Sequence, residues 1–297
     1  VREVSMTRAW LLLLAACSSS SSRGKIDRER ADELFAEVVV DTAPGLSGLA
    51  ADETGALWTV AERAAKAYRI TLDASDHPTV QGFDVTGIPD GTDLEGIAVL
   101  APGKLALGTE GRENGVAKVL LAEQRGAAAF AVTKTIELPE DRIGIKLEHN
   151  HGAEGVCGFG DTIVVAIEGA GIDGGKRWAP VVRIERGAIV KRHRVWLTSK
   201  TGKLSGLDCK LERDGTVAAI AVERHFEETR ILTFALRDAE DVTPAIALDL
   251  GPVLNNTLNL EGIAWLPDGR VVAVIDNQWK TIEGPSELLV FKRGALR

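Results

Sequence analysis

The sequence is poor in several features, and each shortage excludes a class of protein. Basic residues form no cluster: 35 Lys and Arg stand against 43 Asp and Glu, for a net charge of −8. Nucleic acid and an anionic membrane surface are therefore excluded as main partners. Long apolar runs are also lacking, because the N-terminal one, 9–16, is too short to span a bilayer.

Cysteine is scarce as well, with 3 residues in a chain of 297. Cys157 and Cys209 lie in apolar runs, three and four residues after equivalent positions of the repeat described below. Because side chains alternate along a strand, the two thiols should face opposite sides of their strands. We therefore expect buried, unpaired thiols and no disulfide between them.

The N-terminal apolar run is typical of a bacterial lipoprotein signal. Leu14-Ala15-Ala16-Cys17 resembles the lipobox, in which the cysteine is lipidated and becomes the new N-terminus, and five serines follow it. We expect a signal peptide at 1–16, lipidation of Cys17 and a flexible tether at 17–34. An ordinary secretory signal is the alternative. The expected location is the bacterial cell envelope, at the outer membrane or in the periplasm, with the lipid anchor as the only membrane attachment.

The rest of the chain is rich in Val, Ile and Gly, which favours strands and turns. One pattern occurs five times: Ser or Glu, Gly, an apolar strand, a turn, a second apolar strand and an acid. A period near 50 residues with several strands per unit is typical of a β-propeller. The first positions of the five repeats are Ser47, Glu95, Glu154, Ser205 and Glu261.

Each repeat is followed by two more candidate strands, so the sequence predicts four-stranded blades. The strand at 35–41 supplies the outer strand that the last blade lacks and removes an exposed sheet edge. No linker or change of composition interrupts 35–297. We therefore predict an all-β, five-bladed β-propeller in a single domain that is a monomer, with six blades as the alternative.

The repeated polar residues should meet at one end of the propeller axis. The first strand of every blade lines the channel, and the second strand runs back to the same end. The acids that end the second strands, expected as an outer ring, are Glu62, Glu110, Glu168, Glu223 and Asp276.

Three buried carboxylates close together cannot all stay ionised without a counter-charge, so the inner ring predicts a bound cation. Its oxygen ligands suit Ca²⁺, and the lack of Cys and His at these positions excludes zinc and copper. The predicted ligands are Ser47, Glu95, Glu154, Ser205 and Glu261. In the alternative interpretation, these residues cap the hairpins by bonding to backbone N–H groups.

The order Ser, Glu, Glu, Ser, Glu resembles the central calcium site of the five-bladed calcium-activated nucleotidases, or apyrases. The recurring LEGIA…G…E pattern is similar to bacterial phytase-like propeller domains, and the resemblance spans 36–294. Glu62-Arg63 stands where apyrases have Asp-Arg, and Arg112 lies in the segment that matches their second blade. This segment lacks their base-stacking aromatic residue, and Glu168-Gly169 replaces an Arg pair.

Two functions follow from the residues and the resemblance. In the first, a calcium-binding propeller binds a small phosphorylated ligand or an envelope protein at its mouth, without catalysis. In the second, the chain is a Ca²⁺-dependent hydrolase of phosphate esters or anhydrides. Glu62 or Glu110 would then be the general base, and Arg63 and Arg112 would bind phosphate.

Overall fold

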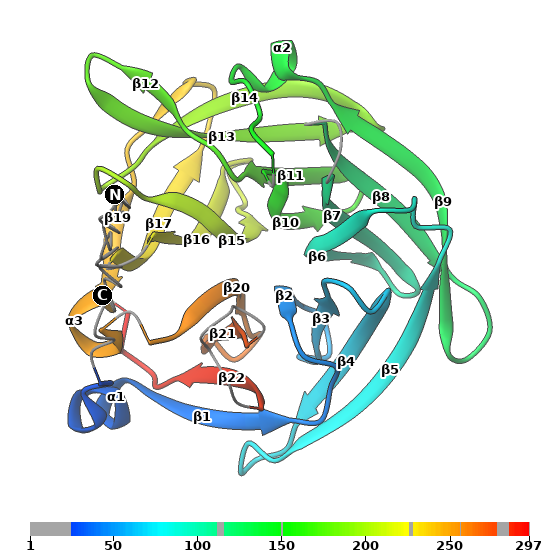
Figure 1. Ribbon diagram of the computed structural model, residues 1–297, viewed down its shortest axis with the longest axis vertical. Coiled ribbons are helices and arrows are strands. Elements are labelled where there is room, and N and C mark those ends of the chain that lie inside the picture. Colours follow the sequence, from blue (N-terminus) through cyan, green and yellow to red (C-terminus); the bar gives the residue numbers. More distant parts are fainter. Residues whose placement is uncertain are drawn as a thin grey trace, which may run out of the picture.

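The strands of the protein form a ring around a central axis (Figure 1). The computed structural model describes residues 25–111, 116–149, 151–225, 228–255, 257–277 and 285–296. Cys17 and Arg112 lie outside these ranges. The helices in the described part are short: α1 (Arg28–Leu34), α2 (Glu140–Ile143) and α3 (Gly251–Leu254).

Antiparallel pairing groups the described strands into four-stranded units, which we call blades 1 to 5, and a short parallel pairing joins the outer strands of blades 1 and 2 into one eight-stranded sheet. Blade 1 contains β2 (Leu46–Ala51), β3 (Leu57–Ala61), β4 (Lys66–Leu72) and β5 (Pro78–Thr86). Blade 2 contains β6 (Thr92–Ala101), β7 (Lys104–Gly111), β8 (Ala117–Gln124) and β9 (Ala129–Leu138). Blade 3 contains β10 (Ala153–Phe159), β11 (Thr162–Ile167), β13 (Lys176–Glu185) and β14 (Ala188–Trp196).

The last two blades complete the ring. Blade 4 contains β15 (Lys203–Leu211), β16 (Val217–His225), β17 (Glu228–Leu236) and β19 (Ala245–Asp249). Blade 5 contains β20 (Asn259–Trp265), β21 (Val271–Asp276), β22 (Ser286–Phe291) and β1 (Phe35–Val40). Two short strands extend blade 3, namely β12 (Gly171–Asp173) and β18 (Asp241–Val242).

The closure of the ring follows the sequence prediction. Strand β1 pairs antiparallel with β22, from Phe35 opposite Phe291 to Val40 opposite Ser286, so the N-terminal strand completes the last blade. The all-β propeller is thereby confirmed. The range predicted as a tether differs at its end, because 28–34 forms helix α1 and buries Ala31.

The hydrophobic core lies between the blades. Each apolar cluster of the described residues draws on two adjacent blades, for example Ile220 and Ile231 of blade 4 with Ile263 and Leu289 of blade 5. The second strands β3, β11 and β21 have both faces buried for this reason, whereas the outer strand β5 is largely exposed. Blade-on-blade packing explains why the second strands read as unbroken apolar runs.

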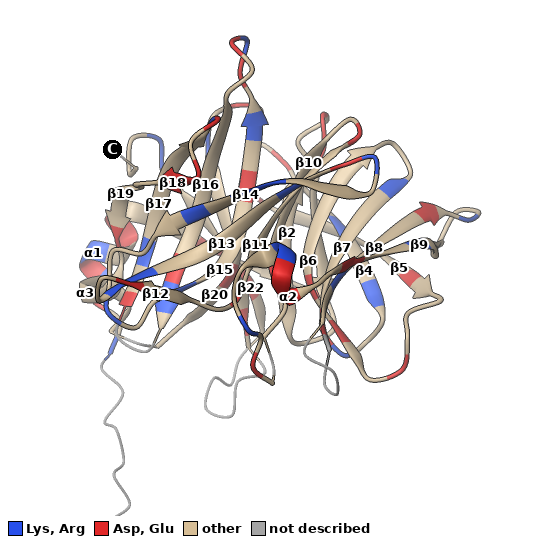
Figure 2. Ribbon diagram, turned by 90° about the horizontal axis from the view of Figure 1, so that it is seen from above, with Lys and Arg blue, Asp and Glu red and all other residues tan. Residues whose placement is uncertain are grey.

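Charged residues cover the outside of the ring without separating by sign. Figure 2 shows Lys and Arg interspersed with Asp and Glu along the strands and loops. None of the helices that the structure describes has the length and apolar character needed to cross a bilayer.

The prediction of unpaired thiols is wrong. Cys157 on β10 and Cys209 on β15 form a disulfide that joins blades 3 and 4. The two side chains do face opposite sides of their own sheets. Because neighbouring blades stack face to face, those opposite sides meet in the same apolar layer, where both sulfurs are buried.

We expect the disulfide to contribute to stability, because it closes a loop with a sequence separation of 52 residues. A loop of this length corresponds to about 4 kcal/mol in the chain-entropy description. Reduction with dithiothreitol should therefore lower the melting temperature, as measured by circular dichroism. A Cys157→Ser/Cys209→Ser variant is the control and should not respond to the reductant. A wild-type melting temperature that is insensitive to reduction would contradict this expectation.

Candidate functional site

A β-bulge occurs at or beside the Ser or Glu position of each first strand. The pairing of the first and second strands skips Glu95, Glu154, Ser205 and Glu261, and in blade 1 it skips the two residues after Ser47. A bulge leaves one residue unpaired and redirects its side chain, and bulges often lie next to functional sites. The repeated polar residues are thus placed by a repeated backbone irregularity.

The glycine that follows each of these positions allows the first strands to approach one another at the axis. A Cβ atom at Gly262 would lie 2.5 Å from the carbonyl carbon of Gly48, and one at Gly206 would lie 2.9 Å from Cα of Gly262. A Cβ at Gly96 would lie 2.7 Å from the carbonyl oxygen of Glu154. The channel is therefore narrow, and the polar residues beside these glycines are forced close together.

The residue two positions before each Ser or Glu faces the end of the second strand. Asp93 pairs with Glu110, and Asn259 pairs with Asp276. In blades 1 and 3, the backbone N–H groups of Glu62 and Glu168 donate to the carbonyl oxygens of Gly45 and Gly152. The same place in blade 4 is taken by two cations, because Lys203 pairs with Arg224.

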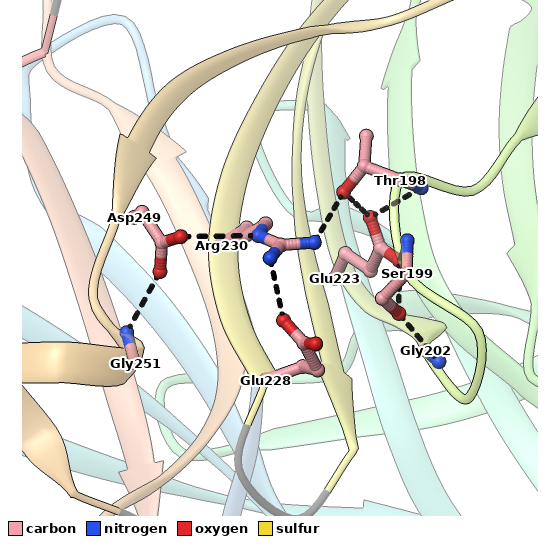
Figure 3. A network of polar contacts seen from close by, with 8 residues as sticks. All are labelled: Thr198, Ser199, Gly202, Glu223, Glu228, Arg230, Asp249 and Gly251. Atoms are coloured by element: carbon pink, nitrogen blue, oxygen red, sulfur yellow. Dashed lines mark hydrogen bonds and ion pairs between the residues drawn. The ribbon is translucent and has the colours of Figure 1, made fainter.

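This register corrects the predicted outer ring in blade 4. Glu223 lies opposite Leu204, one residue out of step with the other outer acids. Figure 3 shows that its carboxylate instead holds the loop before β15: Oε2 accepts from N and Oγ1 of Thr198 (3.0 and 2.6 Å), and Oε1 accepts from N and Oγ of Ser199 (2.9 and 2.7 Å). Arg230 extends this network to Thr198 and to Asp249. Glu223 is therefore a structural residue.

Carboxylates gather at the end of the axis where the first strands begin, which we call the mouth. Oxygen atoms of Asp93, Glu95 and Glu110 lie within 4.8 Å of one another, and so do those of Glu110, Glu154 and Glu168. Glu95 and Glu154 are only 6% and 3% exposed. Two of the predicted inner ligands thus meet acids that the metal prediction did not include.

The other predicted ligands have different partners. Oγ of Ser47 donates to the carbonyl oxygen of Glu95 at 2.7 Å, and Oγ of Ser205 donates to that of Leu260 at 2.8 Å. Each serine therefore links its first strand to that of the next blade, rather than bonding to an N–H group as in a hairpin cap. Glu261 accepts from Asn259 Nδ2 at 2.7 Å.

Two buried ion pairs connect blade 4 to its neighbours. Lys203 is paired with Glu168 of blade 3, and Arg224 is paired with Glu261 of blade 5. Removing one partner of a buried pair typically costs about 3–5 kcal/mol, because the remaining charge is left unpaired. The blade 4 side of the mouth is thus neutralised by the chain itself.

Burial, together with the crowding of acids, shifts the pKa values of the mouth residues upward. Burial, followed by the charge of Glu154, holds the pKa of Glu95 well above its usual range. Burial, followed by the charge of Glu261, does the same for the pKa of Glu154. For Glu62, burial and the charges of Asp276 and Glu261 raise the pKa to about 8. The mouth therefore favours any partner that supplies positive charge.

A pocket of about 220 Å³ adjoins this cluster between blades 1 and 2, and it is lined by Glu62, Arg63, Ile88, Thr92 and Asp93, among others. Nε of Arg63 lies 4.0 Å from Glu62 and 3.9 Å from Asp93, and 62% of its side chain is exposed. The pocket combines an acid of raised pKa, an accessible guanidinium group and a member of the carboxylate cluster.

The residues at the mouth fit a hard divalent cation. The clustered donors are all carboxylate oxygens, the ligand type that Ca²⁺ prefers. Outside these two clusters, Oε2 of Glu261 is a further carboxylate oxygen that is buried without a hydrogen-bond partner among the described residues. Asp93 and Lys203 were missed in the sequence, although both stand two residues before a repeat position and so point to the same side of the strand.

The raised pKa of Glu62 predicts how stability depends on pH. A carboxyl group whose pKa is higher in the folded chain than in the unfolded chain favours folding at low pH. For Glu62 this contribution is lost as the pH rises from its usual value of 4.5 to about 8. Glu95 and Glu154 act in the same direction.

In metal-free buffer, the melting temperature should therefore fall between about pH 5 and 8. In Glu62→Gln the melting temperature should decrease less over this pH range. In Glu123→Gln, which changes an exposed ion pair with Lys104, it should decrease as much as in wild type. Scanning calorimetry across the pH range measures the effect. Identical profiles for wild type and Glu62→Gln would show that Glu62 has no raised pKa.

Known proteins resemble this chain in fold. A search of curated proteins finds no match to the sequence. Among solved structures, an exo-β-1,3-galactanase of Phanerochaete chrysosporium has a TM-score of 0.54 at 11% identity, over 86% of this chain and 63% of that one. The Mala s 1 allergen of Malassezia sympodialis has a TM-score of 0.50 at 9% identity, over 86% of this chain and 95% of that one. Such low identities show a shared fold alone.

A third solved structure, GH43B of the xyloglucan locus of Bacteroides ovatus, has a TM-score of 0.52 at 10% identity, over 86% of this chain and 54% of that one. The sequence itself matches one protein family, Phytase-like, described as "Esterase-like activity of phytase", over residues 42–278. The matched range contains the mouth residues from Ser47 to Asp276. The chain belongs to the phytase-like family.

Proposed function

We propose that this phytase-like propeller is a calcium-dependent hydrolase of phosphate esters that acts at the mouth. The observation that carries the proposal is the pocket in which Glu62 and Arg63 adjoin Asp93 of the carboxylate cluster. Asp93, Glu95 and Glu110 would hold Ca²⁺, which offsets phosphate charge and polarises its oxygens. Phosphate esters match a pocket with one accessible arginine and an adjacent cation site.

Arg63 binds the phosphate in this proposal. Its guanidinium group is largely exposed and lies at about 4 Å from two acids, too far for tight hydrogen bonds. Arginine presents paired N–H donors that match two phosphate oxygens. Arg224 is unsuited to this role because it is buried and paired with Glu261.

Glu62 transfers the proton. Burial and the neighbouring acids raise the pKa of Glu62 to about 8 in the metal-free chain, which favours its protonated form, and in this proposal it donates that proton to the leaving alcohol as the phosphorus–oxygen bond breaks. Water attacks the phosphorus and supplies the oxygen that the phosphate gains, and the proton that this water loses restores the acid form of Glu62 through the solvent. Glu110 lies with the cation ligands, so it serves to bind the cation in this proposal.

A second candidate is a calcium-stabilised propeller that binds a phosphorylated ligand or an envelope protein without catalysis. The two blade 4 ion pairs favour it, because there the cations neutralise glutamates instead of facing a ligand. Turnover separates the two candidates.

Phosphate release from p-nitrophenyl phosphate, nucleotides and phytate, with Ca²⁺ or with EGTA, tests the hydrolase. Turnover should need Ca²⁺. Glu62→Gln should lower kcat about 100-fold or more while Ca²⁺ affinity is kept, since general acids contribute on this scale. Glu95→Gln should weaken Ca²⁺ binding, and Glu123→Gln should change neither quantity. Calcium binding without turnover of any substrate would leave the second candidate, and no binding would overturn both.

We also propose that the protein is a lipoprotein of the bacterial cell envelope, anchored through Cys17. The Cys157–Cys209 disulfide supports this location, because disulfides persist in oxidising compartments outside the cytoplasm.

Cys17 can be tested by fractionation of a Gram-negative host that expresses the full chain. Wild type should sediment with membranes, and Cys17→Ser should move to the soluble fraction. Equal partitioning of the two proteins would contradict the anchor. Cys209→Ser is the matched control and should stay with the membranes.

A further inference from the structure

The mouth is asymmetric, and the asymmetry originates in blade 4. The cross-strand position that carries an acid in the other four blades carries Lys203 and Arg224 there. Like charges directly opposite each other in a sheet destabilise it. Both side chains are also largely buried, which adds a desolvation cost. Such an arrangement persists only if surrounding groups compensate for it.

The compensation comes from the neighbouring blades, and it differs for the two cations. Arg224 reaches Glu261 of blade 5, which also accepts from Asn259. Lys203 reaches Glu168 of blade 3, and Glu168 is a member of the carboxylate group that includes Glu110 and Glu154. The Lys203 ammonium group therefore contacts a cluster whose geometry suits a metal ion.

The two clusters of three acids at the mouth share Glu110, but Lys203 is paired with an acid of one cluster alone. Glu168, which belongs to one group alone, is bound to Lys203. Glu95 and Asp93 belong to the other group, and Asp93 faces the pocket with Arg63.

We propose that the ammonium group of Lys203 replaces a second divalent cation at the mouth. It occupies the Glu110–Glu154–Glu168 group and confines Ca²⁺ to Asp93, Glu95 and Glu110, beside the pocket. The inference rests on the proposed calcium site, and it makes Lys203 the residue that sets the number and position of bound ions. Because the ammonium group is part of the chain, it neutralises the Glu110–Glu154–Glu168 cluster without binding the phosphate of a ligand in the pocket.

Calcium titration of the metal-free full chain by calorimetry tests the inference with Lys203→Met. This change removes the charge and shortens the unbranched side chain by one heavy atom. Wild type should bind one Ca²⁺ and Lys203→Met two, while Lys203→Arg should still bind one. Lys104→Met, at an exposed pair with Glu123, is the matched control and should bind one.

Thermal unfolding gives a second readout that does not depend on activity. Without metal, Lys203→Met should melt below wild type, and Ca²⁺ should raise its melting temperature by more than it raises that of wild type. If Lys203→Met folds under neither condition, Lys203→Gln carries the same test, since it can still hydrogen-bond to Glu168.

The outcomes separate this inference from the proposed function. One Ca²⁺ in both wild type and Lys203→Met overturns the inference and leaves the calcium site standing. No Ca²⁺ in wild type and one in Lys203→Met overturns the proposed site at Asp93 but supports the role of Lys203. No Ca²⁺ in either protein overturns both.

Discussion

Close packing of the first strands at the axis is the constraint on which the rest of this structure depends. Gly206 lies against the backbone of Gly262, and Gly262 lies against that of Gly48, with no room for a Cβ atom. The bulge beside each glycine then turns a Ser or Glu side chain away from the regular pleat. A narrow axis surrounded by bulges necessarily brings acids into a small, poorly solvated volume.

The electrostatics of the mouth follow from this crowding. Burial raises the pKa values of Glu95 and Glu154, and the charges of neighbouring carboxylates raise them further. The chain offsets part of the charge with Lys203 and Arg224, both from blade 4. On the side of blades 1 and 2, the exposed guanidinium group of Arg63 lies about 4 Å from Glu62 and Asp93. A cation bound beside the pocket would add to this offset on the side of blades 1 and 2.

The solved structures resemble this chain in its scaffold, whereas the family match concerns its sequence. The galactanase and the allergen share the fold at identities near 10%, so the propeller itself specifies no chemistry. The phytase-like match, in contrast, is a match of sequence, and its range of 42–278 includes the first and second strands of all the blades. Among the residues that the bulges and strand ends present, Glu62, Arg63 and Asp93 line a pocket.

The sequence by itself determined the propeller, because strand periodicity and a glycine-containing repeat are local properties that recur along the chain. It also identified Glu95 and Glu154 as acids of the mouth. Tertiary structure alone decided which residues meet across blades: the Cys157–Cys209 disulfide and the Lys203–Glu168 pair. The bulge and the longer hairpin of blade 4 set the register that puts Arg224 where an acid was expected. No single strand encodes these contacts, because they depend on how one sheet stacks on the next.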